Sequence, residues 1–444
     1  MISALATDLY ELTMAAGYWR AGLLEPATFE LFIRRLPSRR SYLIAAGLDD
    51  ALEYLEGLRF SDSERAWLGD LPQFAHIPRE FFDDYLRTFT FTGRVWAIPE
   101  GTPVFAGEPL LRVTAPLPAA QIVETALLAI VGFQTNVAAK AARIVDAAQG
   151  RPVIEFGARR AHGLGASLAA ARAAFIGGCA GTSYVEAARR YGIPASGTMA
   201  HSWIQSFATE VAAFREFSRS FEAFGVYLLD TYDTIGAATT LIEAGLKPPM
   251  VRLDSGDLVA LARQVRAMLD RAGLRDTKIF ATGDLDEDRI TEVLAAGAPI
   301  DGFGVGTMLS TVADAPALSA VYKLVQVERH HERVDVVKLS PGKETWPEPK
   351  QVWRVVEGGR AVRDVVAAED ESPIPGATAL LTPAMQDGRR VQPSSSLVTL
   401  QEHCRRSLAI LPPAIRALDA EAAFPVVISD RLAAAGLSAK ELHT

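Results

Sequence analysis

The chain has 444 residues, of which 49% are hydrophobic and 22% charged, and its formal net charge at pH 7 is −8. This length exceeds one ordinary hydrophobic core, so we expect two or three domains of a globular protein. Basic residues form no sustained run, which argues against a nucleic-acid partner because binding of the phosphate backbone needs clustered Lys and Arg. A single small phosphate site is not excluded, since a few Arg side chains and backbone amides suffice.

Cysteine content and the first residues bear on the cellular compartment. Cys179 and Cys404 lie far apart in unrelated contexts, so neither a disulfide framework nor a cysteine-based zinc site is predicted. Asp8 and Glu11 interrupt the first residues, which therefore do not resemble a secretory signal. The Ala-rich stretch 119–148 contains charged and amide side chains, which favours a buried helix or helix pair over a membrane span. We expect a cytoplasmic protein without a membrane partner.

The first hundred residues predict helices and an antiparallel β unit. Residues 1–25 suit a helix with Thr7 or Asp8 as its N-cap. Residues 28–36 alternate between apolar and polar side chains, which is typical of a strand, and residues 47–90 are mixed helix. A compact antiparallel β unit is predicted from three apolar runs punctuated by Pro and Gly, at 95–98, 104–105 and 110–113.

The middle of the chain contains six short apolar runs, each of which stops at a cluster of small, polar or charged residues. The runs are 153–157, 196–200, 226–229, 250–253, 279–281 and 302–305. Helical stretches separate them, so they predict parallel strands buried on both faces. In a parallel α/β barrel the reactive groups lie where the strands end, because loops converge there. We therefore expect an enzyme with its site at the carboxyl ends of these strands.

Beyond Leu324 the composition changes to short β runs with Pro and Gly. These runs are 334–338, 351–356 and 361–366, followed by a helix near 399–418 and a polar tail. The predicted fold class is α/β, an irregular parallel (β/α) barrel with an α+β open-sandwich domain. The predicted domains are residues 1–116, residues 117–325 with the barrel, and residues 326–444, which would fold back on the N-terminal domain to complete the sandwich.

Two side chains at these strand ends are candidates for chemistry. His201 follows the run 196–200, where an imidazole can serve as acid, base or nucleophile, although a histidine bonded to a backbone carbonyl is the structural alternative. Arg252 lies within the most apolar strand, where an unpaired charge is costly. Either Asp254 satisfies it, or a ligand carboxylate or phosphate does so bidentately.

Glycines and carboxylates complete the predicted site. The sequence from Gly302 to Thr307 suits a phosphate cradle, although tight turns also need glycine. Asp254, Asp257 and Asp284 suit ribose hydroxyls or a Mg²⁺ held partly through water, and helix N-capping is their structural alternative. Together these groups indicate a phosphorylated sugar as ligand without naming the reaction.

These residues resemble the nicotinate phosphoribosyltransferase family, a type II phosphoribosyltransferase. The resembling segments follow the family's order and are 7–10, 32–37, 155–160, 197–203, 229–232, 251–258, 304–307 and 320–324, with a weaker similarity at 338–340 and 350–352. The resemblance implies Mg²⁺-dependent joining of nicotinate to 5-phosphoribosyl 1-diphosphate, which gives nicotinate mononucleotide and diphosphate. It also implies coupling to ATP hydrolysis, with ATP as co-substrate, and thus an enzyme of the ligase class.

The resemblance also implies roles for single residues. His201 matches the phosphorylated histidine, and we expect Asp254 to be the second catalytic residue, because a nearby carboxylate can stabilise positive charge on the ribose. Nicotinate would be held by Tyr10, Thr198 and Arg252. The phosphoribosyl diphosphate would be held by Arg159, Asp254, Gly283, Gly304, Gly306 and Thr307. Asp257 and Asp284 would hold the metal, partly through water. The family builds each site across a homodimer interface, which would make Tyr10 serve the neighbouring subunit.

Several alternatives stay open at this point. A nicotinamide or quinolinate phosphoribosyltransferase would have the same architecture, although Tyr10 in the segment 8–11 resembles the nicotinate enzymes more closely. A noncatalytic barrel that binds a sugar phosphate as a sensor would bind the donor without releasing diphosphate. A barrel isomerase or aldolase often needs Lys or Glu at strand ends, and the six turns contain no Lys. The segment after His201 is shorter than in some relatives, so details of an ATP site do not transfer.

Overall fold

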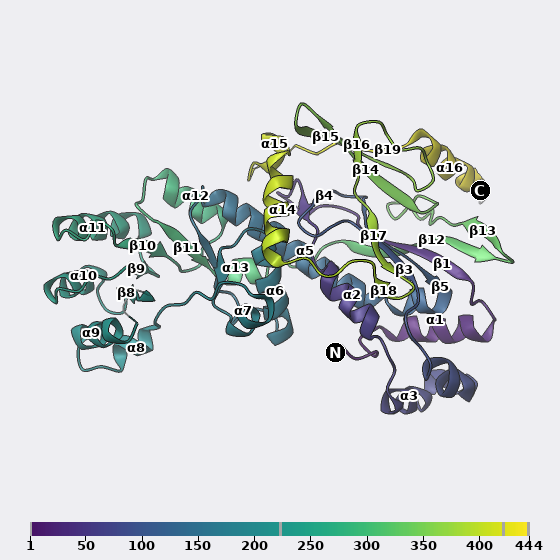
Figure 1. The fold of residues 1–444 in the computed structure, drawn as a ribbon, viewed down its shortest axis with the longest axis horizontal. Helices are drawn as coiled ribbons and strands as arrows, with labels where there is room; N and C mark the ends of the chain where they lie inside the picture. Colours follow the sequence, from purple (N-terminus) through teal and green to yellow (C-terminus); the bar gives the residue numbers. More distant parts are fainter. Residues whose placement is uncertain (1, 222–223, 420–421, 442–444) are drawn as a thin grey trace. The chain divides into compact units, whose positions relative to one another are not determined.

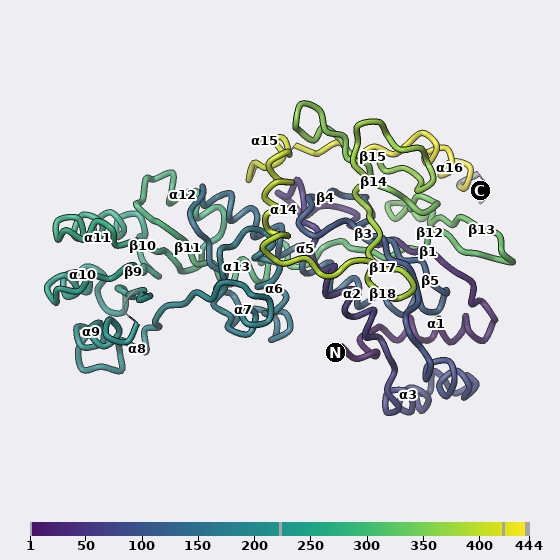
Figure 2. The backbone as a smooth tube through the Cα atoms, in the orientation of Figure 1, coloured from purple at the N-terminus to yellow at the C-terminus, as the bar shows by residue number. Residues whose placement is uncertain are grey.

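The computed structural model describes residues 2–221, 224–419 and 422–441. The chain forms two compact units, one made of Met1–Asn136 with Ala317–Thr444 and the other of Val137–Pro316. Figure 2 shows the early and late parts of the chain, in purple-blue and green-yellow, running together through the first unit. Helix α5 (Glu124–Ala147) contains the first boundary between the units. The division at 116/117 and 325/326 stays a prediction.

The first unit is built around a seven-stranded sheet of order β13-β12-β1-β5-β3-β17-β18. Its strands are β1 (Pro26–Ile33), β3 (Arg94–Ala97), β5 (Pro109–Pro116), β12 (Ala320–Arg329), β13 (Glu332–Asp335), β17 (Thr382–Gln386) and β18 (Arg389–Arg390). Strand β1 pairs antiparallel with both β12 and β5, so N-terminal and C-terminal segments share one sheet. Alternation along β1 buries Phe29, Leu31 and Ile33, which confirms the predicted strand in this region.

A four-stranded sheet of order β16-β14-β15-β19 and a two-stranded sheet complete the β structure of this unit. The strands are β14 (Lys350–Glu357), β15 (Arg360–Ala368), β16 (Ala377–Ala379) and β19 (Val426–Ile428), with β2 (Leu43–Ile44) and β4 (Pro103–Val104). The predicted runs 351–356 and 361–366 are thus confirmed as strands. The run 334–338 is only partly strand, because β13 ends at Asp335.

The helices of the first unit include the predicted N-terminal helix and an unpredicted helix near the C-terminus. They are α1 (Leu9–Arg20), α2 (Leu48–Gly57), α3 (Asp62–Gly69), α4 (Leu117–Ile122), α14 (Leu397–Ala409), α15 (Pro413–Arg416) and α16 (Asp430–Glu441). The stretch 119–148 is a helix pair, α4 and α5, as expected. The predicted helix 399–418 is interrupted at Pro412 into α14 and α15. Helix α16 lies in the expected polar tail, so that prediction was wrong over 430–441.

The second unit contains a six-stranded parallel sheet of order β7-β6-β11-β10-β9-β8. Its strands are β6 (Val153–Glu155), β7 (Gly181–Thr182), β8 (Val226–Leu228), β9 (Met250–Leu253), β10 (Lys278–Ala281) and β11 (Gly302–Val305). Five of the six predicted runs are therefore confirmed as strands. Both faces of the central strands are buried, as Val251, Leu253 and Ile279 show on one face and Arg252 and Phe280 on the other. Closure into a full barrel stays a prediction.

The sixth predicted strand, Ser196–Ala200, is wrong. Only the preceding Ala195 forms a bridge, to Thr182 of β7, and the residues that follow are irregular. Small and polar side chains in this run give little apolar area to bury on a sheet, and Gly197 is exposed. The segment nevertheless reaches the opposite edge of the sheet, because Thr198 Oγ1 donates to the carbonyl of Val226 in β8 at 3.0 Å.

Helices follow the strands of the second unit, and α10, α11 and α12 lie along its sheet in Figure 1. The helices are α6 (Leu164–Ile176), α7 (Val185–Tyr191), α8 (His201–Gln205), α9 (Glu210–Phe221), α10 (Thr234–Glu243), α11 (Leu258–Arg271), α12 (Glu287–Ala295) and α13 (Thr307–Ser310). Helix α11 begins where predicted, because the Asp257 carboxylate accepts from the backbone N–H groups of Val259 and Ala260. Gly273, at φ +78°, follows its end.

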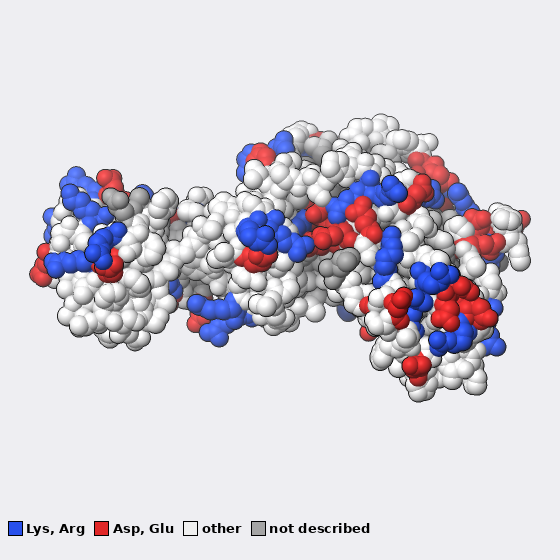
Figure 3. All heavy atoms as spheres, turned by 60° about the horizontal axis from the view of Figure 1, so that its bottom comes forward, with Lys and Arg blue, Asp and Glu red and all other residues white. Residues whose placement is uncertain are grey.

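Surface charge and helix length bear on the expected surroundings of the chain. On the face that Figure 3 shows, Lys and Arg atoms are interspersed with Asp and Glu atoms. Among the described residues, none of the helices combines the length and the apolar character needed to cross a lipid bilayer.

Candidate active site

The carboxyl ends of β8 and β9 bring two aspartates together. These strands are parallel neighbours in which Leu228 is paired with Arg252, so the residues that follow each strand also lie side by side. The backbone N–H of Asp254 lies 3.3 Å from Asp230 Oδ2, and the Ser255 hydroxyl donates to the same oxygen at 2.5 Å. The parallel register therefore concentrates carboxylates at one point of the sheet edge, as the strand-end argument predicted.

Arg252 is the centre of a polar network although it lies on an apolar strand. Its side chain is 9% exposed. It donates from Nε to Thr282 Oγ1 at 2.8 Å, from Nη1 to the Met199 carbonyl at 3.3 Å and from Nη2 to Asp254 Oδ1 at 2.6 Å. Asp254 thus pairs with the charge of Arg252, as the structural alternative predicted. A guanidinium has five N–H groups, so these three bonds leave two that can reach a ligand.

His201 lies on the other side of the same aspartate, at the first residue of α8. Its Nε2 is 3.8 Å from Asp254 Oδ2, and its Nδ1 is 3.2 Å from Thr231 Oγ1. The imidazole is 44% exposed, so solvent or a ligand can reach it. Asp254 therefore has one oxygen toward the guanidinium and the other toward the imidazole, and the predicted pair His201 and Arg252 converges on it.

The surroundings of Asp254 keep its carboxylate ionised. Partial burial raises its pKa, but hydrogen bonds from Thr282 and Arg252 and the charge of Arg252 outweigh burial. The pKa of Asp254 consequently lies below its ordinary value. A carboxylate held ionised beside an imidazole can stabilise positive charge, on the ring or on a ligand.

One group of three side chains at this edge could hold a metal ion. His201, Asp230 and Asp254 each offer a ligand atom, and these atoms lie within 4.8 Å of one another. Asp230 Oδ1 is buried and, within the described part of the chain, has no hydrogen-bond partner. An unsatisfied buried carboxylate oxygen is a feature that a cation would satisfy.

Glycines bring backbone close to this cluster. Gly283 has φ +92°, and a Cβ atom there would lie 1.9 Å from the Asp254 carbonyl oxygen, so only glycine fits the turn after β10. A Cβ atom at Gly304 would lie 2.7 Å from the Phe156 ring and from Thr282 Cγ2. Gly304 is therefore needed for packing of β11, which is the structural alternative to the phosphate cradle. Gly306 precedes Thr307, the first residue of α13.

Other predicted residues lie near strand ends with different surroundings. Asp257 has its carboxylate occupied as the N-cap of α11. Asp284 is exposed and has φ +47°, in the same turn as Gly283. Arg159 is exposed in the turn after β6. Thr198 uses its hydroxyl on the Val226 carbonyl. Their roles in ligand binding stay predictions.

Tyr10 belongs to the other compact unit, where it lies in α1 and is 47% exposed. Burial, together with the charges of Glu124 and Glu11, raises the pKa of its phenol, so it stays protonated in the physiological range.

Asp230 and Thr282 are site residues that were not predicted from the sequence. Asp230 ends the run 226–229 in the same way as Asp254 ends the run 250–253, and Thr282 ends the run 279–281. The signal was therefore present at each strand end. Only the parallel order β10-β9-β8 shows that both side chains border Asp254.

Sequence models of nicotinate phosphoribosyltransferases match most of the chain. The N-terminal domain of the enzyme matches residues 5–132, the family model matches 152–345 and the C-terminal domain matches 375–435. Nicotinate phosphoribosyltransferase pncB2 of Mycobacterium tuberculosis is 46% identical over 442 residues, covering 97% of this chain and 92% of that protein. The chain belongs to the nicotinate phosphoribosyltransferase family. The predicted resemblance is thereby confirmed.

Other members and solved structures agree with this membership. The nicotinate phosphoribosyltransferase of Bacillus subtilis is 45% identical over 83% of this chain and 76% of its own length. The crystal structure of human nicotinic acid phosphoribosyltransferase matches with a TM-score of 0.85 and 29% identity, covering 97% of this chain and 99% of that chain. The nicotinate-nucleotide pyrophosphorylase of Pyrococcus furiosus matches with a TM-score of 0.74 and 27% identity, covering 91% and 95%.

Proposed function

We propose that this protein is a nicotinate phosphoribosyltransferase. It would join nicotinate to 5-phosphoribosyl 1-diphosphate in the first step from nicotinate toward NAD. In this reaction the pyridine nitrogen forms a bond to C1 of the ribose, and the bond from C1 to the diphosphate oxygen breaks. Family membership supports the activity. The observation that carries it for this chain is the convergence of His201, Arg252 and Asp230 on Asp254.

Nicotinate is a flat ring with one carboxylate, and Arg252 suits that carboxylate. Its two remaining N–H groups lie at a mostly buried position, where a charge-assisted hydrogen bond is strong. Thr198 lies beside β8 and would add a contact. We propose that the exposed ring of Tyr10 covers nicotinate in the neighbouring subunit of a homodimer, as the resemblance implies.

The phosphoribosyl diphosphate would lie along the turns after β9, β10 and β11. Loss of diphosphate leaves positive charge on the ribose ring, which the ionised Asp254 can stabilise. The close turn at Gly283 presents backbone next to Asp254, and Gly304, Gly306 and Thr307 would contact the donor at the end of β11. Arg159, in the exposed turn after β6, would bind a phosphate oxygen.

Asp230 and Asp254 are the residues that fit Mg²⁺ best. Both supply carboxylate oxygens, and Asp230 Oδ1 lacks another partner among the described residues. Water and substrate oxygens would complete the six ligands that Mg²⁺ prefers, and the ion would offset the charge of the diphosphate. Asp257 suits this role less well than first predicted, because its carboxylate caps α11. Asp284 would reach the ion only through water.

We also propose that ATP hydrolysis is coupled to synthesis through phosphorylation of His201. Transfer of the γ-phosphoryl group of ATP to a ring nitrogen would give ADP and a phosphohistidine, and water would later release phosphate. Nε2 is the freer nitrogen, since Thr231 contacts Nδ1. Phosphorylation next to Asp254 would place two negative charges together. We propose that this repulsion changes the segment around Ala200 and tightens the donor site.

Turnover with different pyridines tests the proposed function. The protein is incubated with 5-phosphoribosyl 1-diphosphate, Mg²⁺ and one of nicotinate, nicotinamide or quinolinate, with and without ATP, and the mononucleotide is quantified. We expect product from nicotinate, more of it with ATP, and little competition by nicotinamide. Preferential turnover of nicotinamide or quinolinate would replace the substrate assignment and leave the fold and the site unchanged.

A further inference from the structure

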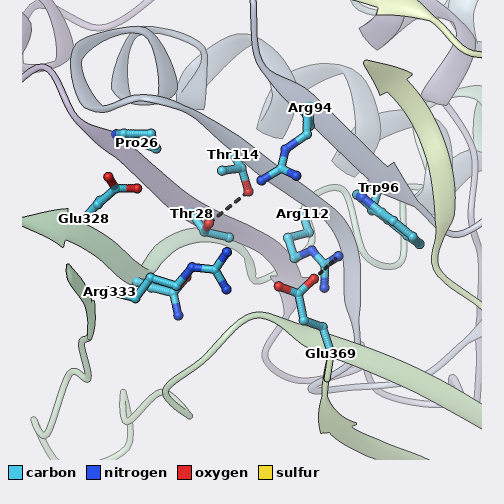
Figure 4. Close-up of a pocket in the computed structure, with 10 residues that line it drawn as sticks. Pro26, Thr28, Arg94, Trp96, Arg112, Thr114, Glu328, Arg333 and Glu369 are labelled. Carbon is cyan, nitrogen blue, oxygen red and sulfur yellow. Dashed lines mark hydrogen bonds and ion pairs between the residues drawn. The ribbon is translucent and has the colours of Figure 1, made fainter. Parts of the chain in front are cut away.

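A polar pocket lies within the first unit, on one face of the seven-stranded sheet (Figure 4). Four neighbouring strands, β12, β1, β5 and β3, supply most of its lining, and β13 and the residue after β15 add the rest. The lining residues are Pro26, Thr28, Arg94, Trp96, Arg112, Thr114, Gln326, Glu328, Arg333 and Glu369. Each of these belongs to the first unit, so the pocket shares no residue with the catalytic cluster of the second.

The strand register explains why polar side chains gather here. Arg94 is paired with Thr114, Thr114 with Thr28, and Thr28 with Gln326, which makes one row across four strands. Alternation sends the side chains of such a row to one face of the sheet. The Thr28 and Thr114 hydroxyls are 2.9 Å apart, and either can donate to the other. The row therefore presents two hydroxyls and a guanidinium together.

Arg112 forms the buried floor of the pocket. Its side chain is 4% exposed, with Nη2 2.6 Å from Glu369 Oε2 and Nη1 2.8 Å from the Lys350 carbonyl. Its guanidinium also lies over the Trp96 ring at 5.1 Å. Burial lowers the pKa of Arg112 despite the charges of Glu369 and Glu30, and the charge of Arg94 lowers it further. The floor is thus a guanidinium fixed by Glu369 and the Lys350 carbonyl.

Arg94 and Arg333 add cationic groups at the mouth. Both are exposed, and within the described part of the chain neither makes an ion pair with a carboxylate. In Figure 4 their guanidinium groups extend toward Thr114 and Thr28 respectively. The carboxylates of the lining are Glu369, which pairs with Arg112, and Glu328, which lies 3.5 Å from His331. Three cations and two anions leave an excess of one positive charge.

The volume limits the size of a ligand. The cavity measures about 180 Å³. Pockets for drug-sized molecules have about 300–1,000 Å³, and a water occupies about 30 Å³ in the liquid, so this cavity suits a group of a few heavy atoms. Guanidinium groups and hydroxyls are the usual partners of phosphate oxygens.

We infer that this pocket binds a small phosphate-bearing anion, either inorganic phosphate or the phosphate group of a small phosphomonoester, between Arg94, Arg333 and the Thr28–Thr114 pair. Arg112 fixes the floor and orients the site. The ligand supplies the negative charge that the lining lacks. This inference does not depend on the proposed catalytic activity.

Calorimetric titration tests the site with inorganic phosphate, glycerol phosphate and, as a monocarboxylate control, acetate. The variants are Arg94→Gln with Arg333→Gln, and a matched control Arg363→Gln, an exposed arginine of β15 outside the pocket. Two lost charge-assisted hydrogen bonds are expected to weaken binding by at least about tenfold. Arg363→Gln should bind as the wild type does, and mononucleotide synthesis should be unchanged in each variant.

The two phosphate probes distinguish the source of the ligand. Tighter binding of glycerol phosphate indicates a phosphomonoester, and equal or tighter binding of phosphate indicates the free ion. Crystals soaked with tungstate provide a second readout that needs no variant, with density expected among Arg94, Arg333 and Thr28. Unchanged affinity in the folded double variant, or tungstate density only elsewhere, would overturn the inference.

Discussion

Two arginine–aspartate pairs with the same bond length illustrate the different tasks of the two units. Arg354 Nη2 lies 2.6 Å from Asp364 Oδ2 in the first unit, and Arg252 Nη2 lies 2.6 Å from Asp254 Oδ1 in the second. The first pair is 4% and 0% exposed, whereas the second is 9% and 25% exposed. Bond geometry therefore does not separate a structural ion pair from a site. The two kinds of pair differ in the access of solvent to the carboxylate, which is 0% exposed in Asp364 and 25% exposed in Asp254.

The residues around the two pairs also differ in whether they leave the carboxylate accessible. Asp364 accepts two hydrogen bonds from Arg354 and has Glu108 beside it, in a region closed to solvent. Asp254 has one oxygen toward Arg252 and the other toward an accessible imidazole. The first arrangement pairs Arg354 with Asp364 and keeps both side chains from solvent. The second leaves binding capacity for a ligand, and substitutions at the two aspartates should have opposite consequences.

The largest effect is expected for Asp254→Asn. This change keeps the shape but removes the charge that would stabilise the ribose cation, so kcat/KM for nicotinate mononucleotide synthesis should fall by about a thousandfold, within the range for loss of one electrostatic group. The free energy of unfolding should fall by only about 1–2 kcal/mol, because solvent reaches Asp254 and an amide oxygen at this position can still accept from Arg252. Steady-state kinetics and urea unfolding measure both quantities. A large loss of stability without a loss of rate would reverse the comparison.

Asp364→Asn should show the opposite profile. It leaves the Arg354 guanidinium buried without its counter-ion, which costs about 3–5 kcal/mol when one partner of a buried pair is removed. Urea unfolding should show this loss, while kcat per folded molecule stays at the wild-type value. Activity that falls in proportion to Asp254→Asn in fully folded protein would mean that the first pair also serves the reaction.

His201→Ala tests whether ATP stimulates mononucleotide synthesis through the imidazole. Without the imidazole there is no nitrogen to accept a phosphoryl group, so the ratio of synthesis rates with and without ATP should fall to about one. Thr231→Val removes only the hydroxyl that contacts Nδ1 and serves as the matched variant, with a partial loss of the ratio expected. Full ATP stimulation in His201→Ala would remove the phosphohistidine from the account.

The smallest effect concerns the pH dependence of stability in the closed region. Burial, and then the charge of Asp364, raises the pKa of Glu108 well above its ordinary 4.5, although Arg354 opposes this. The folded state thus binds the proton more tightly than the unfolded state does. Protonated Glu108 therefore contributes its full stabilisation below pH 4.5, and this stabilisation is lost as pH rises through the pKa of Glu108 in the folded state.

Glu108→Gln should therefore gain stability relative to the wild type as pH rises above this range. Glutamine stays neutral and can still accept from the Phe105 N–H, as Glu108 Oε2 does at 2.8 Å. Melting temperatures of the two proteins, measured from pH 5 upward, give this difference. A difference between the two proteins that does not vary with pH would show that Glu108 titrates normally.

The elements that depend on local patterns could be predicted from sequence. Apolar runs predicted β6, β8, β9, β10 and β11, because burial on both faces requires continuous apolar residues. The run 196–200 failed because small residues resemble a strand end without having the side chains to pack in a sheet. Strand β7 is only Gly181–Thr182, too short for any periodicity.

The residue types of the site could be predicted from the sequence, but the contacts between these residues could not. His201, Arg252 and Asp254 follow from chemistry that is unusual at strand ends. The neighbours of Asp254 depend on which strands are adjacent, and no local pattern gives the order β10-β9-β8. The pairing of β1 with β12 was hidden for the same reason, since it joins segments far apart in the chain.

Release of diphosphate from 5-phosphoribosyl 1-diphosphate shows whether this protein transfers the phosphoribosyl group or only binds its donor. It is measured in the presence and absence of nicotinate, with Mg²⁺ and ATP, alongside binding of the donor. For a transferase we expect one diphosphate released for each nicotinate mononucleotide formed, and hardly any without nicotinate. Tight binding of the donor with no diphosphate released when nicotinate is present would contradict this expectation and would indicate a sensor instead.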